Sequence, residues 1–239
     1  MIIQLRKVTR TFPVRNDRVT ALADVNLEIE AGKLICLCGP SGSGKSTLLF
    51  TMGGMLRPDS GTVRVLDRDL YALSKSERAA FRASQLGFIF QDFHLVPYLT
   101  VRENVLLPLG HLKKSAQSNQ QDCDQLLARL GLSHRLDHKP RQLSAGERQR
   151  TAIARATLLK PPILLADEPT GNLDEDSAEE VYRLLTEYRE QGGTVLVVTH
   201  TRSAWTYADQ VIQIVEGQLQ VNPSVRRTGT SPLRHSTEG

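Results

Sequence analysis

Short apolar runs and amphipathic segments alternate along the first part of the chain. Leu34–Cys38 is a continuous apolar run that ends at a glycine, which is typical of a parallel strand buried on both faces. Apolar residues alternate with polar ones in Val25–Ile29, as in a strand with one buried face. The other predicted elements are strands over Ile2–Val8, Thr62–Leu66 and Gly87–Phe90, and helices over Ser46–Leu56 and Lys75–Arg82.

The middle of the chain has a different pattern. From Thr100 to Leu159 the periodicity is helical and predicts no strand. Two capping boxes, Thr100–Glu103 and Ser144–Glu147, mark helix starts within it. A further helix is predicted over Cys123–Leu130, because Gly131 follows it as a C-cap residue.

Strand patterns resume after this helical region. Pro162–Ala166 and Thr194–Thr199 are predicted as buried strands, and Val211–Val215 with Gln218–Val221 as a hairpin turning at Glu216-Gly217. The helix between the first two strands places apolar residues on one face: Ala178, Val181, Leu184, Leu185 and Tyr188. The order of elements predicts an α/β core with an inserted helical arm. Residues 222–239 are rich in Ser, Thr, Pro and Arg, which predicts a disordered tail.

Composition narrows the class of protein. With 40% hydrophobic and 23% charged residues among 239, the chain has the make-up of a globular domain in water. The net charge of +4 is not gathered into one block, so we favour a mixed solvated surface and expect no nucleic-acid partner. No apolar run approaches the ~18 residues of a membrane span. The first residues lack a signal-peptide pattern, so we expect a cytoplasmic protein.

The chain has three cysteines, which fit a reducing compartment. Cys36 and Cys38 fall on the same side of a predicted strand. A Cys-x-Cys pair alone is a poor metal site, so we interpret both as small buried apolar residues.

A phosphate-binding loop is the strongest motif. The segment Gly39-Pro40-Ser41-Gly42-Ser43-Gly44-Lys45-Ser46 matches G-x-x-x-x-G-K-[ST] between a predicted strand and a predicted helix. Its backbone N–H groups and the helix start would face phosphate oxygens. Lys45 would reach the β- and γ-phosphates, Ser46 would ligate Mg²⁺, and Thr47 could contact the α-phosphate. The alternative, a glycine-rich turn with a chance lysine, occurs in roughly one chain of this length per hundred.

An acidic pair follows a second buried strand. Ile163-Leu164-Leu165-Ala166 leads directly into Asp167 and Glu168. Ligands collect at the carboxyl ends of parallel strands, so Asp167 would hold Mg²⁺ through water and Glu168 would polarise the attacking water. A solvated acidic turn before Pro169 is an equally good interpretation of this segment alone. The phosphate loop favours the metal-binding interpretation.

These residues, together with Leu143-Ser144-Ala145-Gly146-Glu147-Arg148-Gln149-Arg150, resemble the ABC ATPase family. The last segment is similar to the family signature, which binds the γ-phosphate of ATP held by the opposite subunit. The resemblance implies a homodimer that binds ATP and Mg²⁺. It also implies a P-loop NTPase (RecA-like) core with an antiparallel β subdomain over 1–92 and 161–221, and a helical subdomain over about 93–160. The ATPase domain would therefore span 1–221.

The resemblance implies roles for four further residues. Gln91 corresponds to the glutamine that senses Mg²⁺ and the γ-phosphate, and His200 to the histidine that contacts the γ-phosphate. Asp174, in Asn172-Leu173-Asp174, corresponds to the loop that contacts the other subunit, and Phe12 to the aromatic residue that stacks on adenine. Each residue alone is more simply a surface or core residue. Their order along the chain supports the set.

Two residues depart from the family pattern. Ala145 stands where a glycine is usual, and its Cβ would either crowd the phosphate or be harmless in a helical backbone. Glu147 replaces a commoner glutamine and places a negative charge beside the phosphate site. The capping box would turn Glu147 back to the Ser144 N–H, away from ATP.

The stretch from Gly87 to Leu109 is similar to the lipoprotein-release and macrolide-exporter branch, which has cell-division relatives. This likeness implies a membrane permease partner with a large extracytoplasmic domain, moved by ATP-driven dimer closure. The chain would then lie on the inner face of the cell membrane. Phe93–Leu99 would either line the groove that receives the partner or pack inside the helical arm.

Other functions remain as alternatives at this point. An ATPase of DNA maintenance or cell division without transport would share the fold, but no sustained heptads or Cys-x-x-Cys pairs are present. A translation factor of this type normally carries two cassettes, and this chain has one set of motifs. An inactive regulatory subunit disagrees with the intact Lys45, Asp167, Glu168 and His200.

Overall fold

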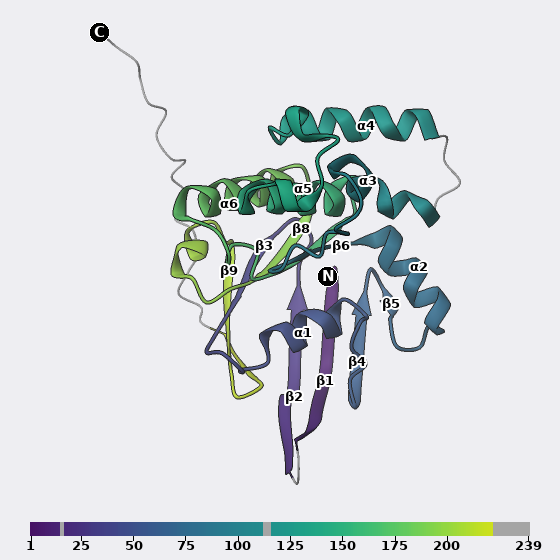
Figure 1. Cartoon of the computed structure of the whole chain (residues 1–239). Helices are drawn as coiled ribbons and strands as arrows, with labels where there is room; N and C mark the ends of the chain where they lie inside the picture. Colours follow the sequence, from purple (N-terminus) through teal and green to yellow (C-terminus); the bar gives the residue numbers. More distant parts are fainter. Residues whose placement is uncertain (15–16, 112–115, 222–239) are drawn as a thin grey trace.

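Two sheets organise the protein (Figure 1). The structure, a computed structural model, describes residues 1–14, 17–111 and 116–221, so the predicted tail lies outside it. One sheet has four antiparallel strands in the order β2-β1-β4-β5, and the other has six strands in the order β10-β9-β3-β8-β7-β6. In the second sheet only β10 runs antiparallel to its neighbour, whereas β9, β3, β8, β7 and β6 are parallel.

The strands are β1 (Ile3–Val14), β2 (Asp17–Ile29), β3 (Leu34–Cys38), β4 (Ser60–Val65), β5 (Arg68–Asp69), β6 (Leu86–Phe90), β7 (Ile163–Asp167), β8 (Thr194–Val198), β9 (Gln210–Val215) and β10 (Gln218–Val221). The α-helices are α1 (Lys45–Met52), α2 (Lys75–Gln85), α3 (Val101–Leu106), α4 (Ala116–Arg129), α5 (Ala145–Thr157) and α6 (Glu175–Glu190). Short 3₁₀ helices span Leu107–His111, Ser133–Arg135, Pro140–Gln142 and Arg202–Thr206.

The first hairpin is longer than the sequence predicts. The strands β1 and β2 pair from Ile3↔Ile29 out to Val14↔Asp17. Most residues of the outer half are exposed or half-buried, so it carries no alternation that would reveal it. The two-residue strand β5 is too short to have a period, so no sequence pattern predicts it.

Helix α1 is shorter than predicted. It ends at Met52 with Gly53 as its C-cap, and the chain turns back so that the Met55 N–H donates to the Phe50 carbonyl at 2.9 Å. Gly53 lies against the Phe88 ring, where a Cβ would come within 2.7 Å of a ring carbon. Gly54 follows the cap with φ 66°, a left-handed conformation that glycine adopts readily, and this turn ends the helix before Leu56.

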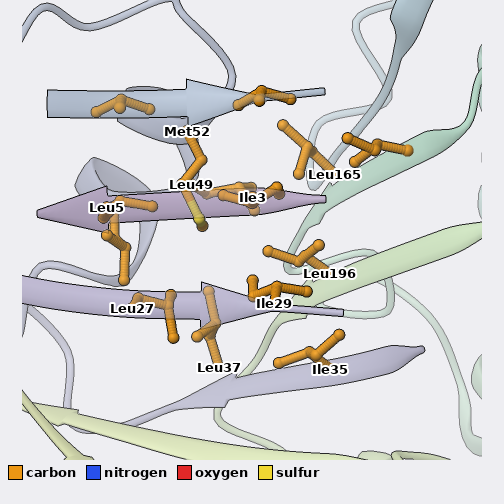
Figure 2. Close-up of a cluster of buried hydrophobic side chains, with 14 of the residues drawn as sticks. Ile3, Leu5, Leu27, Ile29, Ile35, Leu37, Leu49, Met52, Leu165 and Leu196 are labelled. Carbon is orange, nitrogen blue, oxygen red and sulfur yellow. The ribbon is translucent and has the colours of Figure 1, made fainter. Parts of the chain in front are cut away.

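The main core lies between the two sheets, with α1 packed into it. Figure 2 shows Ile3 of β1 and Ile29 of β2 in one apolar cluster with Met52 of α1. The opposite face of β3, with Cys36 and Cys38, packs against α5 and α6. Both faces of β3 are thus buried, which explains its continuous apolar run and confirms the two cysteines as buried.

Helices α3, α4 and α5 share a third apolar cluster that includes Val101, Cys123, Leu127 and Leu143. In Figure 1, α4 lies at the end of the molecule away from β1 and β2. Within the described part of 100–159 there is no strand, as predicted, and both predicted capping boxes are present. The α/β fold class with an antiparallel sheet and a helical insertion is confirmed. The division at residues 93 and 160 stays a prediction.

Helix α6 buries the predicted face only in part. Val181 and Leu185 are buried as expected, but the bulkiest buried side chain on the helix is Tyr182, at 2% exposure. Its hydroxyl lies 2.9 Å from Thr170 Oγ1, which satisfies the polar end of the ring. Sequence periodicity favours Leu184 instead, because it takes no account of the hydrogen bond that allows the Tyr182 hydroxyl to be buried.

Candidate active site

The phosphate loop follows β3 and is pressed against two other strands. Gly39 has φ 151°, and a Cβ there would lie 2.1 Å from the Ile214 carbonyl oxygen of β9. Gly44 has φ 103°, and a Cβ there would lie 2.1 Å from the Ala21 carbonyl oxygen of β2. Glycine is required at both positions because the backbones approach too closely for any side chain.

The loop ends at the first turn of α1. Lys45 is 8% exposed, and its Nζ donates to the carbonyls of Gly39 at 2.9 Å and Pro40 at 2.8 Å. No side chain caps α1 and no acidic residue occupies its first turn, so its first N–H groups are available to an anion. Ser43 Oγ is buried without a hydrogen-bond partner among the described residues. Such an unsatisfied donor beside a helix start fits a phosphate.

The other residues of the loop lie around this turn. Ser46 and Thr47, in the first turn of α1, are half-buried. Pro40, Ser41 and Gly42 are exposed at the tip of the loop. The predicted phosphate-binding residues are therefore continuous along one loop, with its tip in solvent and its ends fixed by β3 and α1.

The structure brings Ser46 and Asp167 together from distant parts of the chain. Ser46 Oγ donates to Asp167 Oδ1 at 2.8 Å, at the end of β7. Burial raises the pKa of Asp167, an effect that the Ser46 hydrogen bond partly offsets. A hydroxyl and a carboxylate oxygen at this separation fit Mg²⁺, which takes few protein oxygens and keeps several waters.

Gln91 follows β6, next to the acidic strand. Strands β6 and β7 are parallel with Phe90 paired to Asp167, so Gln91 and Glu168 leave neighbouring strand ends. A Cβ on Gly171 would lie 3.0 Å from Gln91 Nε2, which places the amide beside the turn after β7. Asn172 Nδ2 also donates to the Gln91 carbonyl at 3.0 Å. No sequence pattern predicts this contact, because it joins residues far apart in the chain.

Glu168 and His200 form a pair at the ends of adjacent strands. His200 Nδ1 lies 3.0 Å from Glu168 Oε1 and 3.1 Å from Oε2. The Glu168 N–H donates to the Val198 carbonyl at 2.9 Å, and its φ of 45° turns the side chain out of the strand direction. The carboxylate is 16% exposed and the imidazole 68% exposed. The structure thus brings the two predicted catalytic side chains within hydrogen-bond distance of each other.

The signature segment begins helix α5. Ser144 Oγ accepts the Glu147 N–H at 3.1 Å, and Glu147 Oε2 accepts the Ser144 N–H at 2.7 Å. The predicted return of Glu147 to Ser144 is therefore confirmed. Ala145 is the first residue of the helix, so the backbone is helical there, and its Cβ fits that conformation. Gly146 is buried, and a Cβ there would lie 3.1 Å from Ser177 Oγ.

Asp174 and Phe12 both have local partners. Asp174 caps helix α6 by accepting the Ser177 N–H at 2.9 Å, and this hydrogen bond lowers the pKa of Asp174. Phe12, half-buried on β1, has the Arg10 guanidinium 4.7 Å from its ring centroid. Arg10 covers one face of the ring, so adenine could stack only on the other. The roles of both residues toward ATP stay predictions.

The Phe93–Leu99 segment divides between the two interpretations. Phe93 is 9% exposed beneath the Arg148 guanidinium, whereas Tyr98 is 73% exposed. Arg155 of α5 donates to the carbonyls of Phe93 and His94, at 2.8 Å and 2.5 Å. A groove of about 450 Å³ lies beside them between α2, β6 and α5. Its lining includes Met55, Arg82, Phe88, His94, Pro108 and Arg155.

Within the part of the chain that the structure describes, none of the helices combines the length and the apolar character of a membrane span.

Sequence comparison matches residues 22–171 to the family described as ABC transporter. The chain is 43% identical to the lipoprotein-releasing system ATP-binding protein LolD 1 of Rhodopirellula baltica, over 91% of this chain and 96% of that protein.

It is 41% identical to the macrolide export ATP-binding/permease protein MacB of Salmonella typhimurium, over 93% of this chain but 34% of MacB, so it spans about a third of that relative. The dimeric structure of the bacterial ABC transporter cassette MJ0796 is 38% identical and superposes with a TM-score of 0.86, over 91% of this chain and 96% of that one. A post-hydrolysis dimer of the same cassette with ADP and Pi is 36% identical, with a TM-score of 0.87 over 95% of this chain and 100% of that one.

Because the glycine-restricted loop and the acidic strand end meet in one site, and LolD 1 and the MJ0796 cassettes match along nearly all of their length, the chain belongs to the ABC transporter family as an ATP-binding subunit that hydrolyses ATP.

Proposed function

We propose that two copies of this chain close around ATP and that closure moves a membrane partner. One observation carries the dimer: α1 packs on one face of the six-stranded sheet, in the core between the sheets, and α5 packs on the other face. The two anion-binding helix starts therefore belong to different layers of one molecule. A second copy would place the Ser144 end of its α5 against the phosphates held at Lys45. The MJ0796 cassettes, whose structures are dimeric, support the formation of a dimer.

The phosphate side of the site would act through fixed charges and donors. Lys45 would exchange its loop carbonyls for phosphate oxygens, and the first N–H groups of α1 would add partial positive charge. Ser46, Asp167 and Gln91 would hold Mg²⁺, which when bound offsets the negative charge of the β- and γ-phosphates. Positioning and electrostatics of this kind supply most of the catalysis in phosphoryl transfer.

The water side would depend on Glu168 and His200. Glu168 would accept a hydrogen bond, and then a proton, from the water that attacks the γ-phosphate. His200 holds the same carboxylate, at 3.0 Å, and is exposed enough to turn toward the γ-phosphate when ATP is present. The histidine would thereby free one carboxylate oxygen for water as the two copies close.

The proposed dimer can be tested with a variant that binds ATP but hydrolyses it slowly. Replacing Glu168→Gln removes the proton acceptor and keeps its shape, so turnover should fall by about 10²–10⁴-fold while ATP is still bound. Chromatography with light scattering should then detect a dimer only with Mg²⁺ and ATP. A matched control, Lys45→Ala in the same background, should stay monomeric. A Glu168→Gln chain that remains monomeric with Mg²⁺-ATP, both alone and beside its membrane partner, would refute the proposal.

We propose that the membrane partner is a permease of the lipoprotein-release or macrolide-export type with a large extracytoplasmic domain. The names of LolD and MacB support this branch, since one belongs to a lipoprotein-releasing system and the other joins the ATPase to a permease. The partner would dock on the groove beside Arg155, next to the exposed apolar side chains Met55 and Leu107. The chain would then lie on the inner face of the cell membrane.

Substitutions at Tyr98 and Phe93 distinguish docking of the partner from packing inside the helical arm. Tyr98→Glu adds charge at an exposed position, so it should lower co-purification with the partner after detergent extraction while leaving the melting temperature of the isolated chain near its original value. Phe93→Glu buries a charge under α5 and should lower that melting temperature as well. Undiminished co-purification of the Tyr98→Glu chain would remove this residue from the docking surface.

A further inference from the structure

The Glu147 carboxylate at the start of α5 has both of its oxygens engaged. Oε2 accepts the Ser144 N–H at 2.7 Å, and Oε1 accepts Arg135 Nε at 2.8 Å. The Glu147 side chain is 11% exposed and that of Arg135 is 32% exposed, so the pair is largely shielded from water. Two hydrogen bonds from different directions fix the orientation of the carboxylate.

Arg135 reaches Glu147 from a different part of the helical arm. It ends the 3₁₀ helix Ser133–Arg135, and its N–H donates to the Leu132 carbonyl at 2.9 Å. Its Nη1 lies 3.2 Å from His138 Nε2, and the His138 carbonyl accepts the Val101 N–H of α3 at 2.8 Å. The guanidinium is therefore held by the turn between α4 and α5, which is itself joined to α3.

This pairing matters because Glu147 carries its charge at a helix start that has to receive an anion. Burial by itself would raise the pKa of Glu147, but the Ser144 N–H and the Arg135 guanidinium outweigh it, and the pKa lies below its usual value. The carboxylate is therefore ionised at neutral pH. An uncompensated negative charge within the first turn of α5 would oppose an incoming phosphate.

We infer that Arg135 is a positioning residue for the signature end of α5. It holds Glu147 toward Ser144 and compensates its charge, so that the first N–H groups of α5 are free to bind the terminal phosphate of ATP held by the second copy. This inference rests on the proposed dimer. Without Arg135 the carboxylate keeps one hydrogen bond, from the Ser144 N–H, with His134 Nε2 3.7 Å from Oε1, and its charge repels that phosphate.

The test measures the ATP concentration that gives half-maximal dimer in the slow Glu168→Gln background, by light scattering with Mg²⁺. Arg135→Gln should raise that concentration about tenfold or more, because a shielded charge loses its partner. Adding Glu147→Gln to Arg135→Gln should return the value to that of Glu147→Gln alone, since the charge that needed compensation is gone. Arg135→Lys keeps the positive charge, so its half-maximal ATP concentration should lie between those of the background and of Arg135→Gln.

Arg102 provides a matched control in the same arm. It pairs with Asp124 at 2.8 Å and Asp137 at 3.0 Å, and neither ion pair includes Glu147. Arg102→Gln removes an arginine of similar exposure, but its partners Asp124 and Asp137 are more exposed than Glu147, at 37% and 85%. The ATP requirement should therefore stay within about twofold of the background.

Three results would overturn the inference. Arg135→Gln could leave the ATP requirement unchanged, or the defect could persist after Glu147→Gln, which would make Arg135 only a support for the arm. An Arg102→Gln defect equal to that of Arg135→Gln would lead to the same conclusion. Failure of the Glu168→Gln background itself to dimerise would instead refute the proposed function.

Discussion

The approach of the phosphate loop to strand β2 can be tested with one methyl group. In Gly44→Ala, the new Cβ would lie 2.1 Å from the Ala21 carbonyl oxygen, against the ~3.5 Å of an ordinary contact. The loop or the strand must therefore move by more than about 1 Å. The backbone of Gly44 also has φ 103°, which an alanine rarely adopts.

The loss of stability from the left-handed backbone and from the clash can each be estimated. Left-handed backbone costs an alanine about 1–2 kcal/mol, and forcing a group into a packed site adds about 1–3 kcal/mol. The sum of about 2–5 kcal/mol is a large part of the roughly 5–15 kcal/mol that typically stabilises a domain. Because Gly44 precedes Lys45, the same displacement moves the ammonium and the first N–H groups of α1. ATP affinity should fall together with stability.

The control is Gly32→Ala. Gly32 has φ 70°, but a Cβ there would meet no atom within 4 Å, so only the backbone cost of about 1–2 kcal/mol applies. Urea unfolding followed by circular dichroism gives the loss of stability for each variant, and a fluorescent ATP analogue gives the affinity. If Gly44→Ala were no less stable than Gly32→Ala and bound ATP normally, the close approach to Ala21 would be wrong.

Three further predictions concern the site and the core. Lys45→Ala should weaken ATP binding by at least about tenfold in calorimetry, because a charge-assisted contact to phosphate is lost; unchanged affinity would contradict its role. Ser46→Ala should abolish the gain in ATP affinity on adding Mg²⁺ and leave the affinity in EDTA nearly unchanged; a retained Mg²⁺ effect would remove Ser46 from the metal site. Burial raises the pKa of Cys36 to about 12 and that of Cys123 to about 11, from 9.0, so at pH 9 neither thiol should react with Ellman's reagent until denaturant is added. Rapid reaction of the folded protein with the reagent would show that these elements open. The free energy of unfolding should also fall as the pH rises from 9 toward 11, because the unfolded thiols ionise at lower pH than the folded ones.

Local sequence alone determined the elements whose side chains have a strong period or a fixed motif. The continuous apolar run of β3 predicts a strand buried on both faces, and the glycine-rich loop after it predicts an anion site, because both depend on neighbouring residues. The capping box of Ser144 and Glu147 is equally local. It was readable because its two hydrogen bonds join residues three apart.

The tertiary structure decided everything that joins distant segments. The outer half of the β1–β2 hairpin is mostly exposed or half-buried and carries no alternation that would reveal it. The contacts of Asn172 with Gln91 and of Arg135 with Glu147 link residues that only the fold brings together. A one-dimensional pattern records which side chains face the core. It does not record which polar groups meet, since hydrogen bonds and ion pairs between segments depend on how those segments pack.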